Sequence, residues 1–422
     1  MRNKLKILAI GDMADNLYIL KKFAKDFEVH LINFPGKGTD FKTNSNVNIE
    51  FFNTMIISKQ VDKIIEIKNN FDLCIVMTWA GARIAYLAGL NYIIYFTGGD
   101  ITAPPFKKNQ KSPENPFPPN LSFIERKFYW KVFKTAIACV APFEEYFNPL
   151  KRYRNDAIRL DKMFVDTELF NENIPPKKLE KKKFTFLSPT RITLGKGTDI
   201  LWEALKLCKT DFEVLQTEYF MEETAIENIS QVKSEENKKL LNDMPRQIKL
   251  IPLINRQELG LYYRGVDAIL GQWRCGVLGG IEKDASFCKV PILCYIDPKK
   301  PWIIDEKEMI PPYYPRTRKP IELAELIDKM VTSKEFREET IQNQFEFIQK
   351  VSSPENVEDE WHKIFKKILA KCKSINRNSN FLRCIEMFMF RFYEKYVIIP
   401  KYHQKNINVW GKIRYEELFN YK

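Results

Sequence analysis

Short apolar runs that end in glycine or proline alternate with helix-like stretches along most of the chain. The first run covers 4–10 and stops at Gly11, a helical pattern follows to residue 27, and a second run covers 28–34. A strand, a helix and a strand within about thirty residues form a βαβ unit, whose two strands lie parallel. The pattern therefore predicts that the chain begins with a parallel sheet.

The same alternation continues through both halves of the chain. Further strands are expected at 73–79, 92–100 and 136–142, and then at 184–190, 212–216, 247–253, 268–273 and 290–296. Strands that alternate with helices favour parallel sheets covered by helices on both faces. The expected fold class is α/β, with two Rossmann-like doubly wound domains. Helices are then expected at 319–332, 334–351 and 355–372.

Chain length and local composition suggest the domain organisation. A chain of 422 residues is too long for one ordinary core. The lysine-rich stretch 171–183, which holds two prolines, is the expected linker between domains at 1–170 and 184–372. A helical tail is expected at 373–422, where ten Lys or Arg and four Glu give a net charge of +6. The Pro- and Asn-rich stretch 103–120 is expected to be a long loop.

The composition of the chain limits the partners and reactions that can be expected. The net charge of +13 favours polyanions, anionic membrane surfaces or phosphorylated small molecules as partners, without choosing among them. Eight cysteines include no C-x-x-C pair and only three histidines occur, so neither a structural zinc site nor Ser-His-Asp chemistry is indicated. Because the sequence suggests neither a cleaved signal nor a membrane span, reduced thiols in the cytoplasm are the favoured setting.

The stretch SPTRITLGKGTDILWEALKL at 188–207 carries the first chemical signal. Arg191 and Lys196 stand between an expected strand and an expected helix, and Gly195 and Gly197 flank the lysine. Backbone N–H groups point outward at a helix start, and glycine lets an anion approach them closely. Two cations beside them indicate a phosphate site. A turn with two solvated basic residues fits this stretch equally well.

The stretch also resembles the donor-site segment of retaining GT-B glycosyltransferases of family four (group 1). Further stretches resemble motifs of that family and occur in the same order along the chain. KILAIGD looks like its first strand and loop, YFTGGDI resembles its "HGSD" segment, and MFVDTELFNEN is close to its domain-junction motif. RQELGLYYRGVDAILGQW and IEKDASFCKVPILCY resemble its later helix, strand and "LEAMACGKPVIA" motif. The resemblance covers residues 5–370 and implies two Rossmann-like domains facing each other across a cleft.

The resemblance also implies a role for individual residues. Arg191 and Lys196 would hold the diphosphate of a nucleotide sugar and stabilise the departing charge, which makes them the implied catalytic residues. Asp284 would bind the ribose. The implied donor site also includes three glycines whose backbone would approach the phosphates or the sugar: Gly197, Gly279 and Gly280. The implied acceptor-side residues are Gly11, Gly98, Gly99 and Asp100.

This chain departs from the family pattern at several positions. Gly276 and Thr97 stand where the family has a glutamate and a histidine, and Glu282 is the candidate to replace the missing carboxylate. Asp284 is one methylene shorter than the family's glutamate, so its ribose contact would need a shift or a water. The only close match to an Asp-x-Asp metal motif is EDE at 358–360, in a polar helical stretch. Neither a metal nor a cofactor is expected.

Two aromatic and basic stretches, 123–136 and 381–399, each have two interpretations. Each stretch could lie on an anionic membrane surface beside a lipid-linked acceptor. Each could instead be a helix whose apolar face packs on the N-terminal domain, with its lysines in water.

The favoured function is a metal-independent, hexosyltransferase-like retaining enzyme. It would move a sugar from a UDP- or GDP-sugar to a glycan or glycolipid acceptor in surface polysaccharide or glycoconjugate synthesis. The alternative is a non-catalytic nucleotide- or glycan-binding protein on the same fold, which the residues at 97 and 276 favour. Nucleic acid is not an expected partner, because the chain has the charge but no recognition motif.

Overall fold

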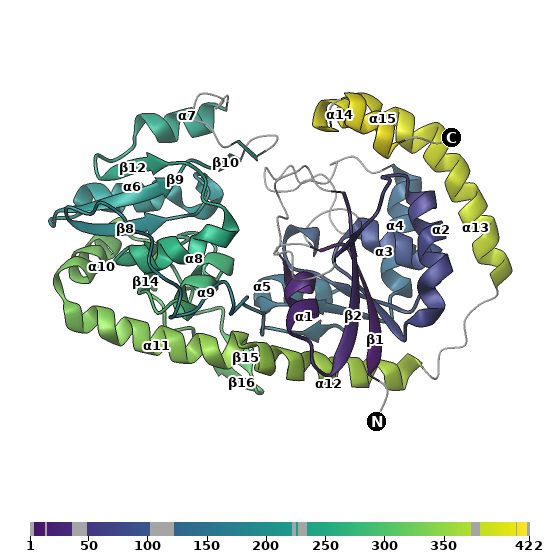
Figure 1. The fold of residues 1–422 in the computed structure, drawn as a ribbon, viewed down its shortest axis with the longest axis horizontal. Coiled ribbons are helices and arrows are strands. Elements are labelled where there is room, and N and C mark those ends of the chain that lie inside the picture. Colours follow the sequence, from purple (N-terminus) through teal and green to yellow (C-terminus); the bar gives the residue numbers. More distant parts are fainter. Residues whose placement is uncertain are drawn as a thin grey trace.

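Two α/β domains lie side by side, and two long helices run along one edge of both (Figure 1). The structure is a computed structural model. It describes residues 4–12, 15–35, 49–101, 122–221, 225–226, 234–372, 380–410 and 412–419, so the predicted loop at 103–120 lies outside the described residues. Within those ranges, no helix is long and apolar enough to cross a membrane.

The N-terminal domain is built on a seven-stranded parallel sheet with the strand order β3-β2-β1-β4-β5-β6-β7. Its strands are β1 (Leu5–Ile10), β2 (Phe27–Asn33), β3 (Glu50–Phe51), β4 (Leu73–Val76), β5 (Tyr92–Tyr95), β6 (Ala138–Ala141) and β7 (Ile158–Arg159). Its helices are α1 (Asn16–Phe23), α2 (Ile57–Ile67), α3 (Trp79–Leu87), α4 (Phe123–Thr135) and α5 (Phe143–Lys151). Both faces of β1 are buried, because Leu8 joins one core and Ile7 the other. That is why residues 7–10 of this strand are all apolar.

The C-terminal domain has a five-stranded parallel sheet with the order β12-β9-β8-β13-β14. Its strands are β8 (Phe184–Ser188), β9 (Phe212–Thr217), β12 (Ile248–Ile251), β13 (Ala268–Leu270) and β14 (Ile292–Leu293). Its helices are α6 (Thr198–Leu207), α7 (Glu235–Asn242), α8 (Arg256–Gly265), α9 (Gly280–Phe287) and α10 (Pro320–Thr332). Two small hairpins pair β10 (Phe220–Met221) with β11 (Ala225–Ile226) and β15 (Trp302–Ile304) with β16 (Lys307–Met309). The predicted fold class is confirmed.

The long helices α11 (Lys334–Ser352) and α12 (Pro354–Cys372) connect the two domains. Together with α10 they confirm the three helices predicted after the second sheet. The apolar face of α12 packs on the N-terminal sheet, where the ring of Trp361 meets that of Tyr95 edge-on at 5.2 Å between centroids. The predicted range 184–372 therefore ends in a helix that packs on the other domain. An amphipathic pattern shows that a face is buried but not which sheet buries it.

The tail runs over the outer helices of the N-terminal domain (Figure 1). It consists of α13 (Asn380–Tyr393), a π-helical turn η5 (Glu394–Ile398), α14 (Ile399–Trp410) and α15 (Lys412–Leu418). Met387 and Phe390 of α13 join the core that also buries Val132 and Phe133 of α4. The rings of Phe128 and Phe390 stack at 5.8 Å between centroids. One face of each aromatic and basic stretch therefore packs on the N-terminal domain.

Candidate functional site

In both sheets the strand order reverses at a defined point. Ligands of open parallel sheets bind beyond the carboxyl ends of the strands at this switch point. It lies between β1 and β4 in the first sheet and between β8 and β13 in the second. Gly11 follows β1, and Arg191 and Lys196 follow β8. In the connection after β13, Gly279 precedes α9 and Gly280 is its first residue. Residues predicted from separate motifs thus gather at the two switch points.

The loop after β8 is fixed against the loop after β13. The turn η3 (Leu194–Lys196) ends at Gly197, whose φ is 78°. A Cβ on Gly197 would lie 2.9 Å from the backbone carbonyl carbon of Trp273, so only glycine fits this left-handed turn without strain. The Trp273 amide donates to the Lys196 carbonyl oxygen at 2.8 Å. Because α6 begins directly at Thr198, the positive end of this helix also faces the loop.

Arg191 and Lys196 bring two cations to this loop. The guanidinium of Arg191 lies 5.8 Å from the ring centroid of Tyr219. The Nζ atom of Lys196 donates to Oε1 of Gln272 at 3.0 Å. Within the described part of the chain neither side chain is paired with a carboxylate, whereas Arg256, Arg274 and Lys300 each are. The loop is thus equipped to hold an anion.

Glu282 shapes the second loop instead of facing outward. In its buried carboxylate, Oε1 accepts a hydrogen bond from the backbone amide of Gln272 (2.9 Å), and Oε2 accepts one from the backbone amide of Gly279 (2.8 Å). The side chain of Gln272 in turn donates to the Val277 carbonyl oxygen at 2.6 Å and accepts from Lys196. Sequence reasoning missed Gln272. The available signal was a polar residue near the end of the strand predicted at 268–273.

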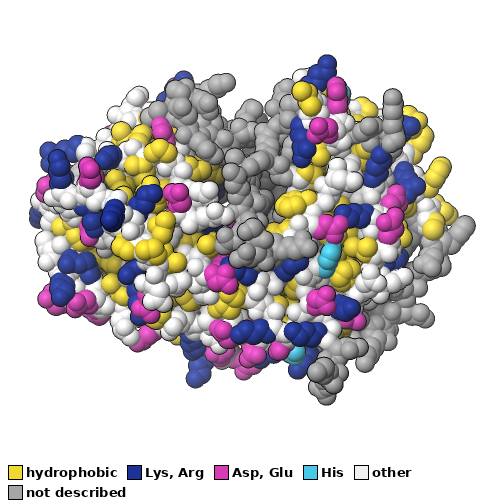
Figure 2. All heavy atoms as spheres, in the orientation of Figure 1, with side chains coloured by type: hydrophobic (Ala, Val, Ile, Leu, Met, Phe, Trp, Pro, Cys, Tyr) yellow, Lys and Arg dark blue, Asp and Glu magenta, His cyan; other side chains and the backbone are white. Residues whose placement is uncertain are grey.

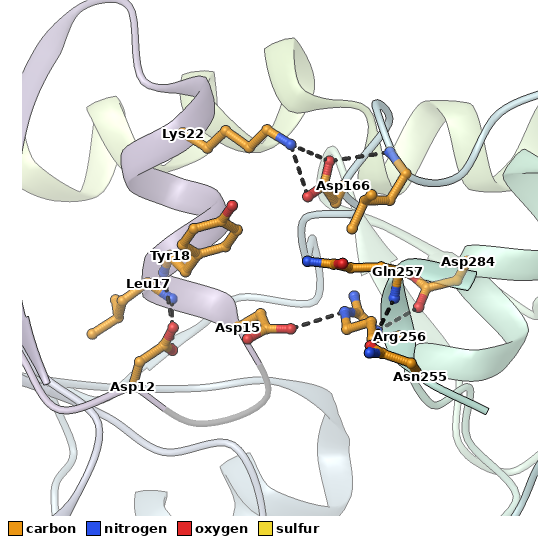
Figure 3. A network of polar contacts seen from close by, with 11 residues as sticks. Asp12, Asp15, Leu17, Tyr18, Lys22, Asp166, Asn255, Arg256, Gln257 and Asp284 are labelled. Carbon is orange, nitrogen blue, oxygen red and sulfur yellow. Dashed lines mark hydrogen bonds and ion pairs between the residues drawn. The ribbon is translucent and has the colours of Figure 1, made fainter. Parts of the chain in front are cut away.

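Asp284 belongs to a network that joins the two domains (Figure 3). Its Oδ2 atom pairs with Nη1 of Arg256 at 3.0 Å, and Nε of the same guanidinium pairs with Oδ2 of Asp15 at 2.8 Å. Arg256 begins α8 of the C-terminal domain, and Asp15 precedes α1 of the N-terminal domain. The predicted ribose ligand is thus held by an arginine that also reaches across the domain interface. Neither Arg256 nor Asp15 was predicted.

Burial and charge act in opposite directions in this network. Burial raises the pKa of Asp284, and the Arg256 charge offsets part of that rise. Burial would lower the pKa of Arg256, but the charges of Asp284 and Asp15 outweigh it and raise this pKa. Beside them, burial lowers the pKa of Lys283 to about 8. A ligand hydroxyl that approaches Asp284 must therefore compete with a charged hydrogen bond.

The N-terminal side of the interface is fixed by two aspartates (Figure 3). Asp12 accepts the backbone amides of Leu17 and Tyr18, each at 2.9 Å, and so holds the first turn of α1. Asp166, from the junction motif, accepts Nζ of Lys22 at 2.7 Å. These contacts fix α1 beside the domain junction, with Asp15 at its start.

The backbone explains why a glutamate is absent from position 276. Gly276 has a φ of 72°, and a Cβ there would lie 2.7 Å from the Cβ of Asp297. A side chain at this position would be strained and would clash. This loop therefore has no room for a glutamate at position 276, and the Glu282 carboxylate is occupied by backbone amides.

The predicted acceptor-side residues lie at two places. Gly11 is at the switch point, whereas Gly98, Gly99 and Asp100 follow β5, one strand further along the sheet. Asp100 is buried, and its Oδ1 accepts the amides of Gly98 and Ile101 at 3.1 Å each. Its Oδ2 is buried and has no hydrogen-bond partner among the described residues, and burial raises the pKa of Asp100 to about 7.

Two doubly wound parallel sheets, each with its switch point at the carboxyl ends of its strands, define the GT-B fold. No protein-family model and no curated protein matches the sequence. Among solved structures, Anabaena HepE in complex with UDP and glucose is similar, with a TM-score of 0.58, 13% identity and coverage of 86% of this chain and 100% of that one.

Two other solved structures are similar to the same extent. Sucrose-phosphate synthase from Thermosynechococcus elongatus has a TM-score of 0.59 and 11% identity, with coverage of 87% of this chain and 100% of that one. A glycosyltransferase from Rickettsia africae has a TM-score of 0.55 and 16% identity, with coverage of 89% and 100%. These likenesses establish the fold of the chain.

Proposed function

We propose that this protein is a glycosyltransferase that uses a nucleotide sugar as donor. The observation that carries the proposal is the pair Arg191 and Lys196 at the switch point of the second sheet, without carboxylate partners in the described part of the chain. Cations placed in this way suit a diphosphate. The solved HepE complexes contain UDP or UDP-glucose on a similar fold, which supports this choice of donor.

The proposed reaction uses a UDP- or GDP-sugar and retains the configuration at the anomeric carbon. The bond from that carbon to the diphosphate oxygen breaks, and an acceptor hydroxyl oxygen bonds to the same face. The hydroxyl proton leaves with the diphosphate. Arg191 and Lys196 stabilise the negative charge that develops on the leaving group. Gly197, Gly279 and Gly280 let the backbone approach it, and the proposal needs neither a metal nor a cofactor.

The proposed acceptor is a glycan or a lipid-linked glycan used in surface polysaccharide or glycoconjugate synthesis. The proposed setting is the cytoplasm, at the inner face of the cell membrane. The acceptor would meet the N-terminal domain near Gly11 and the stretch 98–100, because the donor occupies the facing domain.

A second candidate function is nucleotide or glycan binding without turnover. It is favoured by the left-handed Gly276, which replaces a carboxylate, and by the engagement of Asp284 with Arg256. A nucleotide-binding protein would need the same diphosphate site as the enzyme, so nucleotide binding alone does not separate the two functions, whereas turnover does.

The diphosphate site is tested by melting the protein with UDP, GDP, ADP and single-stranded RNA. A ligand that binds only the folded protein raises its stability in proportion to ln(1 + [L]/Kd). We expect UDP or GDP to raise the melting temperature of the wild type and of Lys206→Ala, an exposed surface variant of α6. We expect Arg191→Ala and Lys196→Ala to lose most of this increase. Equal increases in all four proteins would refute the site.

A further inference from the structure

Helix α13 is apolar on two opposite faces. Met387 and Phe390 are buried against the N-terminal domain. On the other side of α13 and its continuation η5, five large apolar side chains are between 43% and 73% exposed: Ile385, Phe388, Met389, Phe392 and Tyr396. They follow each other at positions i, i+3, i+4, i+7 and i+11, the spacing that places residues on one side of a helix. We call these five residues the outer stripe.

The acidic residues of this segment are turned toward the protein. Glu386 accepts from the Tyr86 hydroxyl at 2.6 Å and pairs with Lys131. Glu394 is buried and accepts the backbone amides of Ile57 and Ser58 at 2.5 and 2.9 Å. It thereby caps α2, which has no capping side chain of its own.

The basic residues of the same segment stay at the surface. Arg391 and Lys395 are exposed on the flank of the outer stripe, and the Arg391 side chain is half exposed although it reaches Asp62. The polarity of the helix is thus the reverse of that of an ordinary surface helix, because acids face the protein while aromatic and basic side chains face outward. Hydrophobic side chains also reach the surface along the edge that α13 occupies in Figure 1 (Figure 2).

Such a face needs a partner, because monomeric proteins rarely expose a continuous apolar patch of this kind without function. We infer that the outer stripe rests on an anionic lipid bilayer. The aromatic rings enter the boundary between headgroups and acyl chains, and Arg391 and Lys395 lie against the anionic headgroups. The helix lies on the bilayer and does not cross it.

Charge complementarity favours lipid over a second copy of the chain. The tail carries ten Lys or Arg and four Glu, and both glutamates on α13 and η5 contact the protein. Two copies that met through this face would bring their cations together, whereas an anionic surface attracts them. The inference rests on the proposed function only for the purpose of membrane binding, which would bring a glycosyltransferase to lipid-linked acceptors. Vesicle binding is measured without turnover.

The test uses full-length protein and substitutions on the exposed face. Removal of the tail would be a poor test, because it would also remove the Glu394 cap and the cover of Phe128. The test variant is Phe388→Ser/Phe392→Ser. The matched control is Ile310→Ser/Ile321→Ser, which removes two exposed apolar side chains from the C-terminal domain. Circular dichroism and melting temperature verify that both variants fold like the wild type.

Flotation is measured with vesicles of phosphatidylcholine alone and of phosphatidylcholine with phosphatidylglycerol. We expect the wild type and the control to float with the anionic vesicles and to be released by high salt. We expect the fraction bound to fall about tenfold or more in the test variant, and severalfold in Lys395→Glu.

Two results would overturn the inference. One is a folded wild type that fails to float with anionic vesicles, or that floats no better than the test variant. The other is a concentration-dependent dimer that the test variant loses, without vesicle binding, which would assign the outer stripe to a second copy. Turnover without vesicle binding would contradict this inference but not the proposed function. Vesicle binding without turnover would contradict the proposed function but not this inference.

Discussion

Replacement of Asp100 by asparagine should remove a pH-dependent loss of stability. One carboxylate oxygen of Asp100 accepts two backbone amides, and the other is buried with no partner in the part of the chain that the structure describes. Burial raises the pKa of Asp100 to about 7, although the amide hydrogen bonds pull it down. Asparagine keeps the accepting oxygen and stays neutral at every pH, so it imitates the protonated acid.

The direction of the effect follows from the two protonation states. An aspartate in the unfolded chain has a pKa of about 3.9, so between about pH 4 and about pH 7 the folded protein holds a proton that the unfolded chain has lost. The unfolding free energy of the wild type therefore falls as the pH rises through this window and levels off above it. A shift of about three units corresponds to about 4 kcal/mol at most. Local opening of the 98–101 loop would reduce the measured loss.

The assay is urea unfolding of the wild type and Asp100→Asn at several pH values across this window. Other groups titrate in both proteins and contribute equally to both. The difference in unfolding free energy between wild type and variant therefore isolates the contribution of Asp100. We expect the wild type to lose up to about 4 kcal/mol relative to the variant between about pH 4 and about pH 8. Asp211→Asn, at a side chain that is 82% exposed, controls for the lost charge. A difference between wild type and Asp100→Asn that stays constant with pH would refute the reasoning.

Three further predictions concern the site. Gly276→Glu should lower the melting temperature without raising turnover, because its backbone is left-handed and a Cβ would meet Asp297; a more active variant would contradict this. Arg256→Ala should lower the unfolding free energy by about 3 kcal/mol in urea titrations, since it leaves Asp284 buried with an unpaired charge; an unchanged midpoint would show that the network is dispensable. Turnover should survive EDTA, and activity that chelation abolishes and manganese restores would count against the proposed mechanism.

Much of the fold could be predicted because parallel strands are buried on both faces. The strands predicted at 4–10 and 28–34 form β1 and β2, and residues 7–10 of the first are apolar and buried without alternation. The stretch 256–265 forms α8, the helix that its family resemblance implies, and Asn255 caps it. The packing of α12 could not be predicted, because its amphipathic pattern does not identify the sheet that covers it.

The positions of the candidate site residues could be predicted better than their contacts. Gly11, Arg191 and Lys196 lie at switch points because each follows a predicted central strand. The partners of Glu282 and Asp284 depend on how distant segments meet. Asp15 and Arg256 belong to different domains, so no local pattern links them. The clash that a side chain at position 276 would make with Asp297 likewise depends on a segment about twenty residues away.

The most direct test of the central claim is the release of free nucleoside diphosphate from individual UDP- and GDP-sugars, with a glycan or lipid extract as acceptor. We expect one donor to be turned over by the wild type and, at a similar rate, by Lys206→Ala. Arg191→Ala and Lys196→Ala should each be slower by about a hundredfold or more, the scale expected for the loss of one preorganised charge-stabilising group. Release at the same rate in all four proteins would contradict the assignment of the site, and UDP or GDP binding without release from any sugar would contradict the proposed catalysis.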